Sequence, residues 1–258
     1  MVKKKLDRET KKTILNARDM IEAVAKADGN EAETRRRVER IFESLMGYDT
    51  LKHITREHAV HGVGDTEYCD FAIQLDNKES SVPIVLVELK KVNVNLMPKH
   101  LKQVSSYAIN MGCEWVLLTN GKEWKLYHIS FGQPPQPKLV DSWNLINDDP
   151  VILAEKFSSV GYKNVKKGGL ARLWEKSNVL AARNLLKAIL SAESLNLLRR
   201  KLKRSTGVLV SLEEVIGAVR HMLNEAAIAD MENLNISVSE KKQQKRRTSS
   251  KTKKGSEV

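Results

Sequence analysis

Two short apolar stretches decide the fold, YCDFAI at residues 68–73 and VLVELK at residues 85–90. Both are rich in residues that favour extended backbone, so they predict two neighbouring strands, Tyr68–Leu75 and Val82–Lys91. Side chains alternate between the two faces of a strand. In the first strand, alternation places Cys69, Phe71, Ile73 and Leu75 on one face and Tyr68, Asp70 and Ala72 on the other.

Charged residues interrupt both stretches. A hairpin centred on Glu79 would bring Asp70 opposite Glu88, with their Cβ atoms about 5 Å apart. Two carboxylates so close repel each other unless a cation lies between them. Mg²⁺ suits such a place because it binds one or two carboxylates together with water and phosphate. Lys90 shares a face with Glu88 and could orient or deprotonate a water, or stabilise charge on a phosphate.

Two alternatives stay open at this point. Glu88 and Lys90 could be strand-end charges that reach solvent. A slip of one residue in the register would also send Asp70 to the opposite face of the sheet.

The flanking sequence predicts the other elements of this region. Amphipathic spacing, helix-ending glycines and an Asn-Gly turn mark them. In chain order they are helices Thr13–Lys26 and Glu31–Met46, strand His53–Val60, helix Pro98–Met111, and strands Glu114–Thr119 and Trp124–Ile129. Residues 31–130 therefore follow the order α-β-β-β-α-β-β, and residues 1–135 predict one mixed α/β domain that begins with a helix.

The sequence changes character after this domain. The run Gly132–Pro137 contains three prolines and predicts a boundary segment. Residues 136–236 predict a helical region, with helices at Leu170–Leu190 and Glu193–Leu202 and a third that begins with a capping box formed by Ser211 and Glu214. No catalytic constellation occurs in this region, so packing or oligomerisation, with a possible homodimer, is its expected role.

The chain of 258 residues has a formal net charge of +12, and most of this charge lies at its ends. Residues 240–258 hold eight Lys or Arg against two Glu, and the first 12 residues hold six against two acids. Residues 237–258 predict a disordered basic tail, because they lack the apolar side chains that a core requires. The tail is either an arm that binds nucleic acid nonspecifically or a solubilising tail.

Composition excludes several classes of protein. The two cysteines, Cys69 and Cys113, are too few for a disulfide scaffold or a zinc-finger cluster. No apolar run approaches the ~20 residues that span a bilayer. The lysines at positions 3–5 precede no apolar stretch, so no secretory signal is expected. A cytoplasmic protein with a polyanionic partner, nucleic acid first, is the expectation.

Two helices carry further polar candidates. Glu31 lies on the face of its helix that is expected to pack inward, so it is either a further metal ligand or a favourable charge at a helix start. Gln103 and Tyr107 are spaced i, i+4 and point the same way. The alternative for this pair is the edge of an ordinary amphipathic helix.

Taken together, these residues resemble the N-terminal nuclease domain of type I restriction enzyme R subunits, which belongs to the PD-(D/E)xK nuclease superfamily. The resemblance covers residues 30–130. It rests on NEAETR at 30–35, LMGYD at 45–49, Asp70, Glu88-Leu89-Lys90, Gln103 with Tyr107, and LTNGKEW at 118–124.

The resemblance implies a restriction-endonuclease-like core, a mixed central sheet flanked by helices, and hydrolysis of DNA phosphodiester bonds that depends on Mg²⁺, with Mn²⁺ as a substitute. It makes Asp70, Glu88, the Leu89 carbonyl and Glu31 the metal ligands. Lys90 would be the catalytic lysine, with Asp70 and Glu88 beside it. Gln103 and Tyr107 would be accessory residues.

The chain departs from this family in two ways. Cys69 stands before Asp70, where many members of the superfamily have Pro. No phosphate-binding loop of the type GxxxxGK[ST] occurs, so a standalone deoxyribonuclease without a helicase motor is expected, an endonuclease in preference to an exonuclease. A prokaryotic, viral or mobile-element context is expected. The alternatives are a catalytically silent nucleic-acid-binding or assembly module on the same fold, and a structural protein without a nucleic-acid role.

Overall fold

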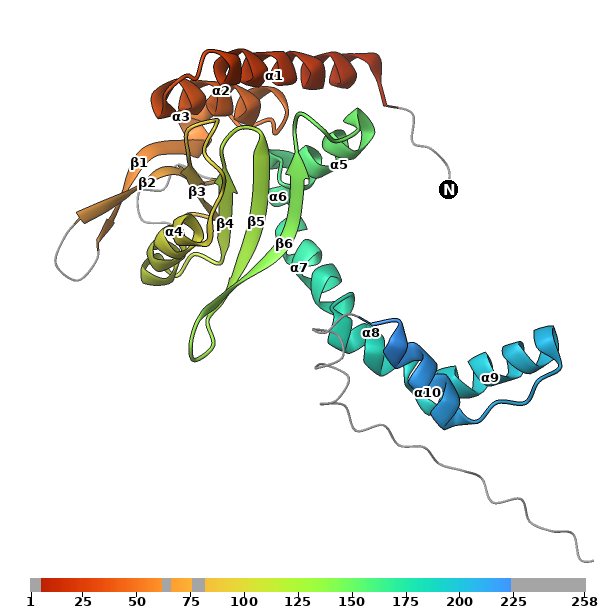
Figure 1. Ribbon diagram of the computed structural model, residues 1–258. Helices are drawn as coiled ribbons and strands as arrows, with labels where there is room; N and C mark the ends of the chain where they lie inside the picture. The colour runs from red at the N-terminus through yellow and green to blue at the C-terminus, as the bar shows by residue number, and fades with distance from the viewer. Residues whose placement is uncertain (1–5, 62–65, 76–81, 224–258) are drawn as a thin grey trace, which may run out of the picture. The chain divides into compact units, whose positions relative to one another are not determined.

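The computed structural model describes residues 6–61, 66–75 and 82–223, and its first part is built around a six-stranded sheet (Figure 1). The strands are β1 (Ile54–His61), β2 (Thr66–Ile73), β3 (Val85–Leu89), β4 (Trp115–Thr119), β5 (Glu123–Ser130) and β6 (Gln136–Asn144). They lie side by side in the order of the sequence. Strands β3 and β4 are parallel and joined by helix α4 (Pro98–Met111), whereas every other neighbouring pair is antiparallel.

Helices cover the two faces of the sheet unequally. The larger core packs residues of α1 (Arg8–Lys26), α2 (Glu31–Ser44) and α5 (Pro150–Ser159) against the strands, with Phe42, Trp124 and Phe157 fully buried among them. A smaller core on α4 joins Val104 and Ala108 to β2 and β3. The short helices α3 (Thr50–His53) and α6 (Tyr162–Val165) and helix α7 (Gly169–Val179) complete the elements of this region.

The helices begin and end at the signals that the sequence carries. Asn30 caps α2 and forms a capping box with Glu33, and Gly47 follows the helix with a positive φ of 70°. Pro98 opens α4, and Gly112 ends it in the left-handed conformation. On α1 the four positions predicted to face the core, Ile14, Ala17, Ile21 and Val24, are all buried. The predicted order α-β-β-β-α-β-β is confirmed for residues 31–130, with the one-turn helix α3 in addition.

The register between β2 and β3 is the predicted one. Phe71 pairs with Val87, Ala72 with Leu86 and Ile73 with Val85, as a hairpin centred on Glu79 requires. Residues 76–81 themselves lie outside the described residues.

The predicted alternation along β2 is wrong at one position. Phe71 and Ile73 lie in the larger core, but Cys69 lies in the smaller one with Ala72 and Leu86. The interruption falls at Asp70. Asp70 and Glu57 of β1 are not paired, although the flanking pairs Arg56–Phe71 and His58–Cys69 form. Glu57 has a positive φ of 46°, so the neighbouring strand leaves regular extended backbone at this point.

The sheet extends beyond the boundary expected at residue 135. Residues 136–144 were expected to begin a helical region, but they form β6 and pair with β5 along its length. Chain contacts divide the protein into two compact units, Met1–Ser177 and Asn178–Val258. The helices α5–α7 follow β6, and most of this segment belongs to the first unit because Leu153, Phe157 and Leu170 are buried in its larger core.

The second unit is helical, as the sequence predicts. It contains α8 (Ala182–Ile189), α9 (Ala192–Thr206) and α10 (Leu212–His221) around a small core that includes Leu186, Leu195 and Leu212. The capping box of Ser211 and Glu214 is confirmed. The single helix predicted over residues 170–190 is instead two, α7 and α8. Residues 237–258, the predicted tail, lie outside the described residues.

Within the described ranges, none of the helices has both the length and the apolar character needed to cross a bilayer.

Candidate active site

The carboxylates of Asp70 and Glu88 lie on neighbouring strands and are almost completely withdrawn from solvent. Asp70 is 8% exposed and Glu88 2%. The paired residues of β2 and β3 end at Phe71–Val87, and each carboxylate belongs to the next residue of its strand. The backbone N–H of Leu89 donates a hydrogen bond of 2.7 Å to Asp70 Oδ2, which ties the carboxylate of one strand to the end of the other.

Each of these buried carboxylates has a cationic partner. Lys90 Nζ lies 2.5 Å from Glu88 Oε1. Arg35 of α2 donates from Nη2 to Asp70 Oδ1 and from Nη1 to Glu57 Oε1, the latter at 3.1 Å. Buried charges are stable only when paired in this way, because water no longer solvates them.

Burial decides the protonation of Glu88. Removal from water raises its pKa to about 7, and the hydrogen bond and charge of Lys90 offset this only in part. The negative charges of Asp70 and Glu31 raise it further. Burial disfavours the charged form of Lys90 too, but the attraction of Glu88 outweighs it and the pKa of Lys90 is raised. A carboxyl group with a pKa near neutrality in such a place is typical of functional sites.

Glu31 lies in the first turn of α2, half-buried at the edge of this group. Its charge acts on Glu88, Lys90 and Arg35, raising the pKa of each. The structure therefore brings Glu31 within electrostatic reach of the two strands.

The accessory pair lies on α4. Gln103 Nε2 donates to the Tyr107 hydroxyl at 3.0 Å, so the predicted i, i+4 arrangement is confirmed. Tyr107 is buried in the smaller core with Cys69 and Leu86, directly behind the strands that carry the carboxylates. His100, one turn earlier on α4, has a pKa lowered by burial and by the charge of Lys90, which places the start of α4 near that lysine.

A network of backbone contacts fixes the strand end that carries Glu88 and Lys90. The Lys90 N–H donates to the Thr119 carbonyl at 2.9 Å, and the Val92 N–H donates to the Thr34 hydroxyl at 3.2 Å. Thr119 Oγ1 in turn accepts from the Gly121 N–H, and Trp124 Nε1 donates to the Gly121 carbonyl. The residues of the LTNGKEW and NEAETR stretches thus include several that hold the site strands in position.

The pattern of the sequence did not identify Arg35 and Glu57 as site residues. With Tyr68, Cys69 and Asp70 they line a depression of about 270 Å³. Arg35 follows Glu31 by one helical turn on the same face, and this spacing was a signal that could have found it. Glu57 reaches Arg35 only because of the register of β1 and its own backbone conformation, which no local pattern reveals.

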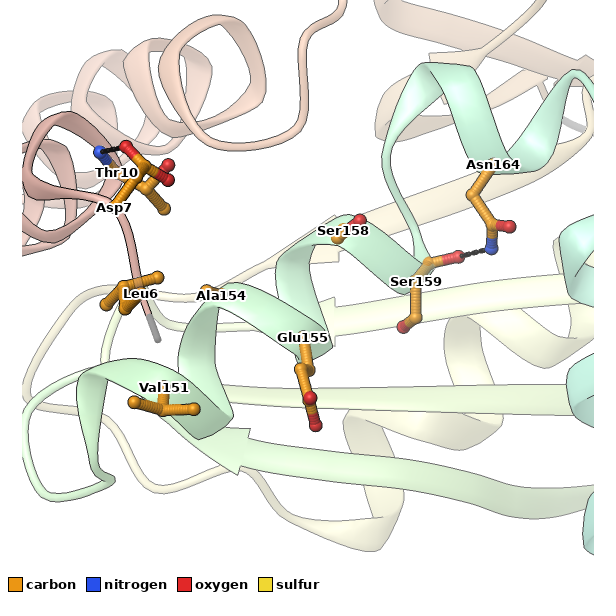
Figure 2. Close-up of a pocket in the computed structure, with 9 residues that line it drawn as sticks. All are labelled: Leu6, Asp7, Thr10, Val151, Ala154, Glu155, Ser158, Ser159 and Asn164. Carbon is orange, nitrogen blue, oxygen red and sulfur yellow. Dashed lines mark hydrogen bonds between the residues drawn. The ribbon is translucent and has the colours of Figure 1, made fainter. Parts of the chain in front are cut away.

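A larger cavity of about 570 Å³ lies elsewhere, between the start of α1 and helices α5 and α6 (Figure 2). None of the predicted site residues lines it. Two of its polar side chains are used locally: Asp7 caps α1 by accepting from the Thr10 N–H at 2.8 Å, and Asn164 donates to the Ser159 carbonyl at 2.6 Å.

Comparison with protein families identifies one match. Residues 30–139 match the family model described as Type I restriction enzyme R protein N terminus (HSDR_N), so this segment is similar to that N terminus. The matched segment runs from the cap of α2 into β6 and contains every residue predicted for the site. Comparison with curated proteins and with solved structures gives no match.

The residues predicted to bind a metal, Asp70, Glu88 and the Leu89 carbonyl, all offer oxygen atoms, the donors that Mg²⁺ prefers. Among the residues that the structure describes, no three His, Cys, Asp or Glu side chains are grouped closely enough to hold a metal. The protein thus offers two carboxylates, a number that Mg²⁺ accepts when water and phosphate complete its shell.

Proposed function

We propose that the protein is a nuclease that hydrolyses DNA phosphodiester bonds with a divalent cation, on a restriction-endonuclease-like core of the PD-(D/E)xK type. The observation that carries this proposal is the adjacency of buried Asp70 and Glu88 on paired strands, with Lys90 hydrogen-bonded to Glu88. The family match of residues 30–139 supports a role in restriction-modification.

The proposed roles follow from chemistry. Asp70, Glu88 and the Leu89 carbonyl would hold Mg²⁺, with Glu31 assisting from α2. The ion would supply a Lewis acid and a water of lowered pKa. Lys90 would orient the attacking water or stabilise charge on the phosphate, since its ammonium is already fixed beside Glu88. Gln103 and Tyr107 would support the site from α4 or contact the DNA.

A cleavage assay tests the proposal. Supercoiled plasmid, linear duplex and single-stranded DNA are incubated with Mg²⁺ or Mn²⁺. The wild type should give metal-dependent product, and Asp70→Asn and Lys90→Ala should each reduce the rate by ~100-fold or more. The matched control is Asp19→Asn, the same change at an exposed position on α1. Cleavage that persists undiminished in the Asp70 and Lys90 variants would contradict the proposed roles.

A second candidate is a catalytically silent module that binds nucleic acid or assembles with partners. The observation that favours it is the ion pair between Arg35 and Asp70, which engages one of the two carboxylates with an internal cation. This candidate predicts salt-dependent DNA binding that survives Asp70→Asn. It also predicts that no product forms with any divalent metal in the assay above.

A further inference from the structure

Arg35 lies where three acidic side chains meet. Its guanidinium joins Asp70 to Glu57, and the charge of Glu31 acts on it from the preceding turn of the same helix. Arg35 and Asp70 line the same depression, with Glu57 at its exposed rim. Acidic groups therefore outnumber the single arginine here, so the surroundings of Asp70 favour a cation.

Asp70 has only two carboxylate oxygens, and both are engaged. The Leu89 N–H donates to Oδ2, and the Arg35 guanidinium donates to Oδ1. An oxygen that accepts a charge-assisted hydrogen bond from arginine is a poorer ligand for a metal, since both cations need the same lone pairs.

We propose that Arg35 competes with the divalent cation for the Asp70 carboxylate, and that Glu57 is the alternative partner which keeps the guanidinium in the site when the cation binds. Arg35 is then a positioning residue that sets the affinity of the site for metal. The inference rests on the proposed function, because it concerns the metal that this function requires.

The position of Glu57 suits this role. It lies between Arg56 and His58, which pair with Phe71 and Cys69 on either side of Asp70, and its positive φ of 46° is a conformation that residues other than glycine rarely adopt. Its side chain is 69% exposed, so it accepts the guanidinium without being buried itself. Asp70, in contrast, is buried and needs a cationic partner at all times.

The first test measures Mn²⁺ binding to the full chain by the paramagnetic resonance signal of free Mn²⁺. Arg35→Gln should lower the dissociation constant by about tenfold, the scale of one lost ionic contact near a partly buried site. Arg36→Gln is the matched control, because it removes the same charge from an exposed position on the same helix. It should bind Mn²⁺ as the wild type does.

Thermal unfolding provides a readout that is independent of the binding signal. Without its arginine, Asp70 is a buried carboxylate that lacks its cationic partner, so Arg35→Gln should unfold at a lower temperature in EDTA. Mg²⁺ should raise the unfolding temperature more in Arg35→Gln than in the wild type. A variant Arg35→Lys, which keeps a cation on α2, covers the case in which Arg35→Gln fails to fold.

A double-mutant cycle tests the part played by Glu57. Glu57→Gln should weaken Mn²⁺ binding by about threefold in the wild type, because Arg35 then has Asp70 as its main partner. In the Arg35→Gln background the same change should have no such effect. An equal effect in both backgrounds would mean that Glu57 acts only as a negative charge, and would overturn its role as the alternative partner.

The outcomes separate this inference from the proposed function. Suppose that the wild type binds Mn²⁺ and that Asp70→Asn abolishes this binding. If Arg35→Gln then binds Mn²⁺ with the same or lower affinity than the wild type, the competition is refuted but the metal site stands. If no variant binds Mn²⁺ in a manner that Asp70→Asn abolishes, both the metal site and the competition are refuted.

Discussion

Glu88 shows how burial sets the charge of a single side chain. The chain presents it within the apolar run VLVEL, where every position of β3 is buried. Its pKa of about 7 means that the folded protein holds a proton on Glu88 at pH values at which the unfolded chain, with an ordinary carboxyl pKa of 4.5, has lost it. Lys90 reduces this effect but does not cancel it.

The stability of the protein should depend on pH through this residue. Because the pKa is higher in the folded state, Glu88 stabilises the fold most below pH 4.5, and this stabilisation is lost as the pH rises through about 7. The loss is up to about 3 kcal/mol. In EDTA, Glu88→Gln should therefore show a flatter dependence of the free energy of unfolding on pH, measured by urea denaturation between pH 5 and 8.

The control for this prediction is Glu123→Gln, at the first residue of β5, whose side chain is 39% exposed. It should leave the pH dependence of the wild type unchanged. Identical pH profiles for Glu88→Gln and the wild type would show that burial does not shift the titration of Glu88.

At the scale of elements, the turn between β4 and β5 joins the sheet to the helices. Gly121 has a positive φ of 84°, and a Cβ atom there would lie 2.8 Å from Ile21 Cδ1 of α1 and 3.6 Å from Thr34 Cγ2 of α2. Thr119, Asn120 and Trp124 all hydrogen-bond across the same turn. The turn is thus held by its own contacts and by its close approach to both helices.

Gly121→Ala should destabilise the protein by about 2–3 kcal/mol, because it adds a steric clash to the cost of the left-handed backbone. Gly112→Ala measures the cost of the left-handed backbone alone. Its φ is 70° and no atom lies within 4 Å of an added Cβ, so it should cost about 1 kcal/mol. Urea denaturation of the two variants measures the difference, and equal losses would show that Ile21 yields without cost.

Elements with strong local signals could be predicted from the sequence, and those without could not. Helices α1, α2 and α4 carry their own caps and apolar faces, and the β4–β5 hairpin carries Asn120-Gly121. The sequence does not reveal strand β6, because two prolines precede it, a third is its second residue, and Trp143 is its one buried side chain. An edge strand needs little apolar sequence, so its pairing is decided by β5.

The candidate site also combines features that follow from local sequence with features that arise only on folding. The register between β2 and β3 follows from the length of the connection and the apolar pattern, and the pairs from Ile73–Val85 to Phe71–Val87 have it. The displacement of Cys69 to the other face occurs beside Glu57, whose φ is positive and whose strand is adjacent only after folding. The roles of Asp70, Glu88, Lys90, Glu31, Gln103 and Tyr107 stay predictions, since geometry alone does not measure catalysis.

At the scale of the whole molecule, charge is distributed unevenly. The net charge of +12 is largely carried by the two ends of the sequence, and residues 240–258 alone hold eight Lys or Arg against two Glu. The candidate site, in contrast, is a place where carboxylates gather. The segments proposed to attract DNA are therefore separate in the sequence from the residues proposed to cleave it.

Deletion of residues 240–258 should weaken DNA binding and reduce the slope of log affinity against log salt concentration by several units. A chain of unchanged length with those eight Lys and Arg replaced by Ser should behave like the deletion. Fluorescence anisotropy of a labelled duplex at several salt concentrations measures both. A slope equal to that of the wild type would show that this segment does not contact the phosphate backbone.

The N-terminal helix has a consequence for how the protein is made. Arg18 of α1 donates to the Leu145 carbonyl at 2.7 Å, a partner 127 residues later in the chain, and α1 also packs against α5. A ribosome adds roughly 5–20 residues each second. The part of α1 that packs against α5 is therefore exposed for roughly ten seconds before α5 is synthesised, whereas α2, which follows α1 directly, can cover the rest sooner.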